Sequence, residues 1–273
     1  MSAPTTRGRR NDTYQQWLAL ATNRSKRHRD RSFLIQGVRP LDLAVGRGWP
    51  LRALLHGDRP RSRWAEELLA GPTAAQRVQL SRELLTELGG KDDGVAEIVG
   101  VAVIPDDDLA RLGPAPTLVV AADRPSSPGN LGSLIRSADA LGADGLIITG
   151  HAVDPYDPRV VRASRGSLFA LPTVRAAAAG DVMRWAAERP RALQVLGASD
   201  EATTDVWDHD FSSPTLVVVG NEAAGMSRGW SEACVATVRI PMVGSASSLN
   251  AAIAGSIVLY EAARQRSPGG HGS

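Results

Sequence analysis

The sequence is poor in cysteine and in aromatic residues, and it has no long hydrophobic run. Cys234 is its single cysteine, which excludes an internal disulfide and a cluster of thiolate metal ligands. The most apolar stretch, Ala251 to Tyr260, is about half as long as the roughly 20 residues that a membrane span requires. The first residues include basic side chains, but no apolar segment follows them, so no secretory signal is predicted. We therefore expect a cytoplasmic protein without a membrane span.

Lysine is scarce, and the charge is unevenly distributed along the chain. Lys26 and Lys91 are the two lysines, and the other 29 basic residues are arginines, as in proteins from GC-rich genomes. Up to Arg63 the chain has fourteen basic and four acidic residues, a net charge of +10, so the remainder carries −8. This asymmetry indicates a module that binds a polyanion, joined to a module with another task.

The densest basic segment, residues 23–31, lies between Trp17 and Phe33. Arginine forks onto phosphates and stacks on bases, so this segment predicts contact with RNA or DNA. The alternative is a basic face that is merely solvated. On the first interpretation, the RNA-binding residues are Arg24, Lys26, Arg27, Arg29 and Arg31.

Composition divides the chain into four parts. Residues 1–13 are predicted to be a disordered basic tail, and residues 267–273, rich in glycine and serine, a second disordered tail. Residues 14–113 are predicted to form a small α/β unit and residues 114–266 a larger one. Their boundary lies within residues 105–116, where three prolines and an acidic cluster interrupt the pattern.

Hydrophobic periodicity predicts alternating helices and strands in both units. In the smaller unit we expect helices at 14–21, 39–45, 65–69 and 82–88, and strands at 33–36, 51–55, 78–80 and 96–104. In the larger unit we expect strands at 118–122, 146–149, 173–175, 193–198, 216–220 and 237–241, and helices at 131–141, 159–168, 181–188, 227–236 and 249–264. The alternation of apolar strands with helices in the larger unit is typical of a parallel sheet covered on both faces.

The first candidate motif is residues 128–143, directly after a predicted strand. Its apolar residues recur at helical spacing on one side, so Arg136 must point away from the core. Asn130 is expected at the N-cap of this helix. Arg136 either acts on a ligand or only pairs with Asp139, one turn further along a solvated surface.

The second motif is residues 218–227, in which an apolar strand ends in Gly220, Asn221 and Glu222. Ligands bind at the carboxyl ends of strands in open α/β sheets, and glycine lets backbone approach a ligand closely. A simple turn before a capped helix would also need glycine and asparagine, so this segment alone leaves both interpretations open.

The third motif is residues 240–255: a strand interrupted by Pro241, a flexible turn of glycine and serine, and a helix of small residues. Ser247 or Ser248 is expected to cap that helix, and the free N–H groups of the turn could hold an adenine edge or a carboxylate. The small residues also let another backbone pack closely against the helix, which does not require catalysis.

Together, and in this order, the three motifs resemble those of the SpoU (TrmH-like) branch of the SPOUT methyltransferase superfamily, over residues 117–266. The resemblance rests on Asn130 with Arg136, on Gly220 to Glu222, and on Ile240 to Met242 with Ser248 to Asn250. Residues 162–169 are similar to a family helix that contains serine and glycine, although Arg165 stands where a small residue is common. In the second motif, Ala223 stands where glycine is usual after the glutamate. Residues 14–113 resemble the substrate-binding domain, related to ribosomal protein L30e, that precedes the catalytic domain in many members.

The resemblance implies an α/β fold whose C-terminal parallel sheet contains a deep trefoil knot, and a homodimer with its sites at the interface. It implies transfer of a methyl group from S-adenosylmethionine to a ribose 2′-hydroxyl of RNA, with 23S rRNA as the expected substrate. Related methylases protect antibiotic producers from thiostrepton or avilamycin, so antibiotic resistance is a further expectation.

The resemblance also assigns site residues. It implies that the catalytic residues are Arg136, Asn130, Glu222, Ser248 and Asn250, and that the cofactor-binding residues are Leu196, Gly197, Gly220, Asn221, Ile240, Met242 and Leu249. A guanidinium stays protonated below about pH 12, so Arg136 is expected to bind the target's phosphate and to stabilise the developing alkoxide. No metal is expected, because none of the five histidines has ligand spacing.

Three alternatives stay open. Residues 41–48 mimic the glycine-rich loop of a Rossmann-type methyltransferase, but they end a predicted helix, where that loop should follow a strand, and they lead to Arg52 instead of an acid that could hold ribose. The substrate could be tRNA. The chain could also be a non-catalytic RNA-binding protein in which a methyltransferase domain persists as a scaffold, which a cofactor titration would decide.

Overall fold

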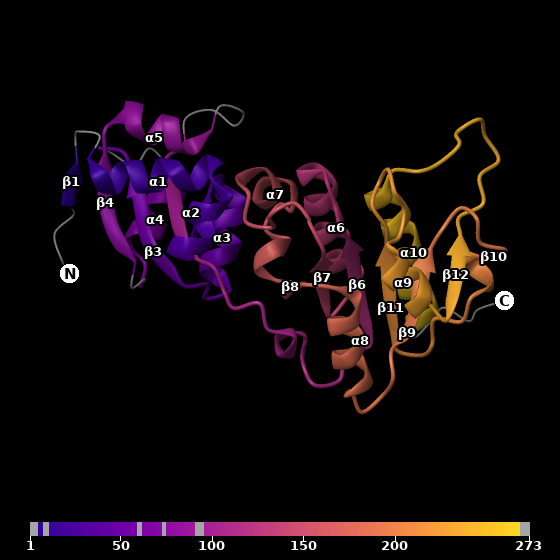
Figure 1. The fold of residues 1–273 in the computed structure, drawn as a ribbon. Coiled ribbons are helices and arrows are strands. Elements are labelled where there is room, and N and C mark those ends of the chain that lie inside the picture. Colours follow the sequence, from indigo (N-terminus) through magenta and orange to yellow (C-terminus); the bar gives the residue numbers. More distant parts are fainter. Residues whose placement is uncertain (1–4, 8–10, 59–61, 73–74, 91–95, 268–273) are drawn as a thin grey trace. The chain divides into compact units, whose positions relative to one another are not determined.

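A computed structural model of the chain describes residues 5–7, 11–58, 62–72, 75–90 and 96–267 (Figure 1). The chain divides into two compact units. The N-terminal unit comprises residues 1–105 and 156–169, and the C-terminal unit comprises residues 106–155 and 170–273. The chain therefore passes between the units three times. Within the described ranges, no helix is long and apolar enough to cross a membrane.

The N-terminal unit is built on a five-stranded mixed sheet of order β1-β4-β3-β5-β2. Its strands are β1 (Thr5–Arg7), β2 (Ser32–Ile35), β3 (Leu51–His56), β4 (Gln76–Leu80) and β5 (Ile98–Val103). Its helices include α1 (Asp12–Thr22), α2 (Arg24–Asp30), α3 (Val38–Gly46), α4 (Arg63–Ala70) and α5 (Arg82–Gly89). Strand β5 runs antiparallel to β2 and β3. A core cluster under α1 and α5 fully buries Tyr14, Leu34 and Val99.

The start of the chain differs from the disordered tail predicted over residues 1–13. Strand β1 pairs in parallel with β4, and α1 begins at Asp12 after the Asn11 cap. Composition could not show this, because a three-residue edge strand depends on the partner to which it bonds. Helix α2 was not predicted either, since it is too short to show a periodic pattern. The tail predicted over 267–273 lies, apart from Ser267, outside the described residues.

Residues 156–169 belong to the N-terminal unit, although the sequence pattern places them in the larger one. They contain helix α7 (Pro158–Ala163) and a short 3-10 helix, η2 (Ser167–Phe169). The buried rings of Tyr156 and Phe169 lie 4.9 Å and 6.2 Å from the ring of Phe33, between centroids. The pattern of a helix shows that it has an apolar face but not which core that face enters.

Residues 41–48 do not form a nucleotide-binding loop. They are the end of α3 and a turn in which Gly48 has a φ of +67°, and they lead into β3. A Rossmann loop follows a strand and opens a helix. The order here is the reverse, which removes the Rossmann alternative.

The C-terminal unit contains a seven-stranded sheet of order β10-β12-β9-β11-β6-β7-β8, with every pairing parallel. Its strands are β6 (Leu118–Asp123), β7 (Gly145–Thr149), β8 (Thr173–Ala176), β9 (Gln194–Ala198), β10 (Thr204–Asp205), β11 (Thr215–Val219) and β12 (Ala236–Arg239). Its α-helices are α6 (Pro128–Ala140), α8 (Ala179–Ala187), α9 (Arg228–Ala233) and α10 (Ala251–Arg266), with 3-10 turns η1 (Leu109–Leu112) and η3 (Val206–Asp208). The predicted α/β fold with a parallel sheet is confirmed, and the trefoil knot stays a prediction.

Helices cover both faces of this sheet (Figure 1). On one face, Trp185 of α8 and Trp230 of α9 pack in a core cluster with the strands. On the other face α10 lies very close, because a Cβ at Gly255 would be 2.8 Å from Leu134 and 2.9 Å from Val219. Burial on both faces explains why the strands are continuously apolar.

Candidate active site

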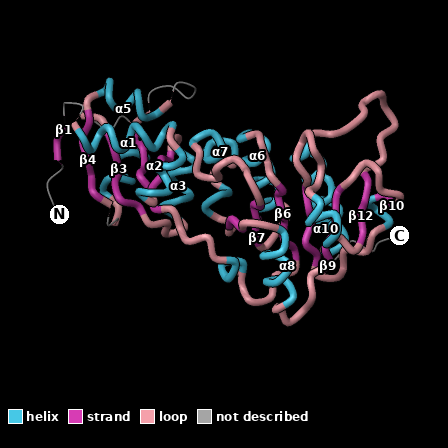
Figure 2. The backbone as a smooth tube through the Cα atoms, viewed as in Figure 1, coloured by secondary structure: helices cyan, strands magenta, loops and turns pink. Residues whose placement is uncertain are grey.

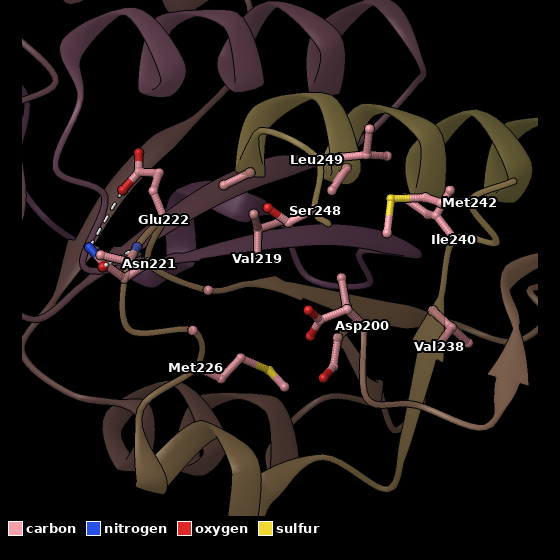
Figure 3. Close-up of a pocket in the computed structure, with 17 residues that line it drawn as sticks. Asp200, Val219, Asn221, Glu222, Met226, Val238, Ile240, Met242, Ser248 and Leu249 are labelled. Carbon is pink, nitrogen blue, oxygen red and sulfur yellow. Dashed lines mark hydrogen bonds between the residues drawn. The ribbon is translucent and has the colours of Figure 1, made fainter. Parts of the chain in front are cut away.

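A pocket of about 380 Å³ lies where β9, β11 and β12 end. Its walls are the residues after each of these strands and the start of α10 (Figure 3). Figure 2 shows that a long loop, residues 240–250, leads from β12 to α10. Ligands of open α/β sheets bind beyond the carboxyl ends of the strands, and pockets of about 300 to 1,000 Å³ are usual for small molecules. Position and size both fit a small ligand.

Most of the residues predicted to bind the cofactor line this pocket, namely Gly220, Asn221, Ile240, Met242 and Leu249. Leu196 and Gly197 do not, which corrects the prediction. Leu196 is fully buried, and a Cβ at Gly197 would lie 2.7 Å from Cε of Met226. The wall is formed instead by residues 198–200, at the end of β9 and beyond it. The preference of ligands for the region past the strand's end would have pointed to Asp200.

The lining combines apolar side chains with two carboxylates. The apolar side chains are those of Val219, Met226, Val238, Ile240, Met242 and Leu249. The carboxylates belong to Asp200 and Glu222 (Figure 3). This set suits a ligand with a flat apolar ring, hydroxyl groups and a positive charge, so the residues present fit S-adenosylmethionine. Among the described residues, no group of three or more His, Cys, Asp or Glu is placed to hold a metal ion.

Glu222 is held by two side-chain donors, one in the first motif and one two residues before it. Its Oε1 accepts a hydrogen bond from Asn130 Nδ2 at 2.9 Å, and its Oε2 accepts one from Ser126 Oγ at 2.7 Å. Burial by itself raises the pKa of this carboxyl, but the hydrogen bonds from Asn130 and Ser126 outweigh burial and lower the pKa. Glu222 is therefore an anion at neutral pH. It is suited to orient donors and attract positive charge, and it is a poor proton acceptor.

A chain of side-chain hydrogen bonds connects the three motifs. Asn250 Nδ2 donates to Asn130 Oδ1 at 2.9 Å, and Asn130 donates in turn to Glu222. The three residues come from the start of α10, the first turn of α6 and the loop after β11. The structure thus brings together three of the five residues predicted to be catalytic.

Two predicted helix caps are corrected. Ser127 is the N-cap of α6, so Asn130 lies in the first helical turn with its side chain available to other partners. Asn250 is the N-cap of α10, and its Oδ1 accepts from the N–H of Ala252 at 3.0 Å. Serine and asparagine cap helices about equally well, so the sequence could not rank neighbouring candidates. Ser248, which does not cap the helix, is exposed and lines the pocket.

Arg136 is exposed on α6 and is not part of the pocket lining. Within the part of the chain that the structure describes, its side chain makes no hydrogen bond or ion pair, so the pair with Asp139 is not formed. It lies six residues beyond Asn130, about 9 Å along the helix axis. Its guanidinium is available to a ligand.

The loop after β11 is closed by its own backbone. Asn221 and Gly225 exchange backbone hydrogen bonds of 2.9 and 3.0 Å. A Cβ on Gly220 would lie 2.6 Å from the backbone of both Gly225 and Met226. Glycine is therefore required at 220 by the loop's own packing, and the approach of a cofactor is not needed to explain it. The side chain of Asn221 accepts from the N–H groups of residues 223 and 224, so it shapes the loop.

One of the five basic residues predicted to bind RNA is buried, which corrects that prediction. Arg27 is 2% exposed, donates to the carbonyl of Leu20 at 2.8 Å and lies 3.7 Å from the carboxylate of Asp157. It is a structural residue of the N-terminal unit. Arg24 and Lys26 are half-buried, and Arg29 and Arg31 are exposed.

Arg52 joins these residues at one end of the N-terminal sheet. Strands β2 and β3 both run antiparallel to β5, so both begin at the same end. A hydrogen bond from Arg29, together with the charges of Lys26 and Arg52, lowers the pKa of Asp30. Sequence reasoning did not group Arg52 with the basic segment, because it is far along the chain from that segment.

Two family models match the chain. The model described as the SpoU rRNA Methylase family matches residues 117–260, and the model described as the SpoU L30e-like domain matches residues 11–100. These matches confirm the resemblance to the SpoU branch in the C-terminal part of the chain and the resemblance to an L30e-like domain in the N-terminal part.

Individual relatives cover almost the whole chain. A Streptomyces viridochromogenes protein named 23S rRNA (uridine(2479)-2′-O)-methyltransferase is 51% identical over 265 residues, 95% of this chain and 92% of that protein. The crystal structure of the SpoU methyltransferase AviRb from the same species, in complex with AdoMet, matches with a TM-score of 0.90 and 51% identity, covering 94% of this chain and 98% of that one. The AdoMet-bound rRNA methyltransferase from Sinorhizobium meliloti matches with a TM-score of 0.83 and 30% identity over 96% of this chain and 98% of that one.

Proposed function

Because the chain belongs to the SpoU rRNA methylase family, we propose that it transfers a methyl group from S-adenosylmethionine to a ribose 2′-hydroxyl of 23S rRNA. The observation that carries this proposal is the pocket at the ends of β9, β11 and β12, beside which hydrogen bonds join Asn250, Asn130 and Glu222. The names of the relatives support it, since one is a 23S rRNA 2′-O-methyltransferase and two were solved with AdoMet.

We assign the methyl donor to this pocket. Ile240, Met242 and Leu249 would cover its adenine, while Asp200 and Glu222 would face its hydroxyl groups and positive charge. When bound, the donor supplies a methyl group that its sulfonium already activates. Leu249→Arg should therefore abolish donor binding in a folded protein, measured by calorimetric titration. Normal affinity in that variant would contradict the assignment.

At the acceptor, the chain must hold a weak nucleophile and help its proton to leave. We assign Arg136 to the phosphate of the target nucleotide and to the developing alkoxide. Asn130, Asn250 and Ser248 would orient the groups around it. Glu222 stays ionised because its pKa is lowered, so the proton passes to a neighbouring phosphate or to water.

RNA affinity is assigned to the N-terminal unit. The contacts proposed are Arg24, Lys26, Arg29 and Arg31, with Arg52 added and Arg27 excluded. These side chains lie on α2 and at the starts of β2 and β3. Phosphate contacts dominate the salt dependence of nucleic-acid binding, so each exposed arginine in this set contributes to the salt slope.

A homodimer through α10 is also proposed. Ile253 and Tyr260, two turns apart on α10, are 53% and 60% exposed, and Val243 in the preceding loop is fully exposed. Residues seven apart lie on the same face of a helix, so Ile253 and Tyr260 form an exposed apolar face of α10, and exposed apolar surface marks interaction sites. Tyr260→Asp should shift the protein to a monomer in sedimentation velocity, and an unchanged dimer would contradict this surface.

Mapping of 2′-O-methylation on ribosomal RNA, with and without the gene, tests the proposed activity. We expect one methylated uridine of 23S rRNA to be lost without the gene, by analogy with the named relative. Loss of a tRNA methyl group would favour the tRNA alternative, and a protein that binds no donor would be the non-catalytic scaffold. A lower inhibitory concentration of a ribosome-targeting antibiotic in the same deletion strain would support a role in resistance.

A further inference from the structure

Asp123, the last residue of β6, is a carboxylate that is 2% exposed and lies outside the pocket lining. Its Oδ2 accepts hydrogen bonds from the backbone N–H of Ser227 at 2.6 Å and from Arg124 Nη2 at 3.1 Å. Its Oδ1 accepts from Thr149 Oγ1 at 3.3 Å, and Thr149 accepts from the indole of Trp230 at 2.9 Å. A buried charge needs such partners, and here they fix the carboxylate in one position.

Arg124 extends this pairing to the loop after β11. Its Nη2 also donates to the carbonyl of Gly225 at 2.9 Å, and its own carbonyl accepts from Asn221 Nδ2 at 2.7 Å. Its backbone has a φ of +50°, a left-handed conformation that costs energy for a residue with a side chain. Gly150 makes room for the side chain, because a Cβ there would lie 2.7 Å from Arg124 Cγ. Such a conformation persists only where contacts on several sides hold it.

We propose that Asp123 and Arg124 form a clamp that holds residues 220–227 in the shape that binds the methyl donor. The clamp grips this loop at the carbonyl of Gly225 and at the N–H of Ser227. The same loop supplies several residues of the pocket lining: Glu222 lies before the two clamped positions, and Met226 lies between them. Neither clamp residue lines the pocket, so both are positioning residues that act through the loop. The inference rests on the proposed function of the pocket.

The clamp predicts a selective effect on the donor. Arg124→Met removes the hydrogen bond to the carbonyl of Gly225. Asp123→Asn removes the negative charge that orients Arg124 and that strengthens the hydrogen bond from the N–H of Ser227. Each should weaken binding of S-adenosylhomocysteine about tenfold or more, the size expected for a charge-assisted hydrogen bond. At saturating donor, kcat should fall less than about threefold, because Arg136, which is assigned to the target phosphate, has no hydrogen bond or ion pair with the loop among the described residues.

The experiment is a calorimetric titration of the full chain with S-adenosylhomocysteine, paired with steady-state methylation and thermal melting. The double variant should be no worse than either single one, since residues that act as a unit are not additive. Arg228→Met is the matched control. Arg228 lies just after the loop, pairs with Glu232 on the surface of α9 and is absent from the pocket lining, so donor affinity should not change.

Donor affinity within about twofold of wild type in folded Arg124→Met and Asp123→Asn would overturn the clamp, as would additive losses in the double variant. A raised KM for RNA with unchanged donor affinity would overturn it too, because Arg124 would then be an RNA contact. If Asp123→Asn does not fold, Arg124→Met decides, since that side chain is 32% exposed. Wild-type protein that binds no donor would overturn the proposed function and the clamp together.

Discussion

The two units differ in the charge that they present to a ligand. The N-terminal unit offers arginines on a short helix and at strand starts, whereas the charged residues that line the C-terminal pocket are the carboxylates Asp200 and Glu222. The N-terminal unit has 20 basic and 12 acidic residues, a net charge of +8, and the C-terminal unit has 11 basic and 17 acidic residues, a net charge of −6. The proposed function thus assigns the attraction of RNA to one unit and the chemistry on it to the other. Substitutions in one unit should change affinity for RNA, and substitutions in the other should change the methylation rate or donor affinity.

Removal of the N-terminal unit is expected to have the largest effect, and it must include residues 156–169. Deleting residues 1–105 alone should cause aggregation, because Tyr156 and Phe169 would lose the core in which they are buried. Replacing residues 156–169 by a flexible linker of about ten residues as well should restore a soluble domain that binds the donor. Light scattering and calorimetry check both outcomes.

The same shortened protein tests the charge division directly. Its affinity for an rRNA fragment should be low, with a shallow dependence on salt, whereas the full chain should show a steep one. Filter binding over a series of salt concentrations measures both slopes. Equal slopes would show that the C-terminal unit attracts RNA by itself, and a monodisperse simple deletion would show that residues 156–169 do not need the N-terminal core.

Arg136 is expected to give the next largest effect, confined to the chemical step. Arg136→Ala should lower the single-turnover methylation rate about a hundredfold or more, while donor affinity is retained. Arg136→Lys should be almost as slow, because lysine keeps the charge but lacks the planar fork. Arg184→Lys on α8 is the control, since Arg184 pairs with Asp181 on the surface. A lysine variant at position 136 with the wild-type rate would contradict the assignment.

Within the N-terminal unit, a buried and an exposed arginine should behave in opposite ways. Arg27→Met should lower the free energy of unfolding by about 2 kcal/mol, because it removes buried hydrogen bonds and leaves Asp157 with fewer partners. Arg29→Ala should leave stability nearly unchanged and reduce the salt slope of RNA binding by about 1. Denaturant unfolding and filter binding measure the two quantities. Loss of RNA affinity without loss of stability in Arg27→Met would reverse the correction made for that residue.

The pH dependence that involves Glu222 is expected to be the smallest effect. A carboxyl whose pKa is lowered on folding stabilises the folded site fully above its unfolded pKa of about 4.3, and this contribution is lost as the pH falls through the lower folded pKa. Donor affinity should therefore be flat between about pH 6 and 8, in wild type and in Glu222→Gln alike. If the donor affinity of the wild type changed between pH 6 and 8, and this change were absent in Glu222→Gln, the lowered pKa of Glu222 would be contradicted.

Sequence reasoning succeeded where the signal is local and periodic. Strands such as β6, β7 and β11 were placed within one or two residues, because a strand buried on both faces is continuously apolar. Asn130, Glu222 and Asn250 belong to three separate motifs that were predicted to form one site, and hydrogen bonds join their side chains in the structure.

The errors share one cause, which is that a residue's role depends on neighbours distant in the sequence. Arg27 belongs to a basic run by composition, yet it is buried against Leu20 and Asp157. Leu196 was assigned to the pocket, but the pocket lies past the end of β9, at Asp200. Neither burial nor the exact end of a strand follows from local composition.

The three passages of the chain between its units constrain recombination among family members. A gene fusion with a single crossover near residue 105 would combine one parent's N-terminal sheet with the other parent's residues 156–169. The rings of Tyr156 and Phe169 would then pack against a core, around position 33, that comes from the other parent. A functional chimera therefore needs further crossovers near residues 155 and 169. We therefore expect that family members acquire new RNA targets more readily by point substitution on the basic surface than by exchange of the whole N-terminal unit.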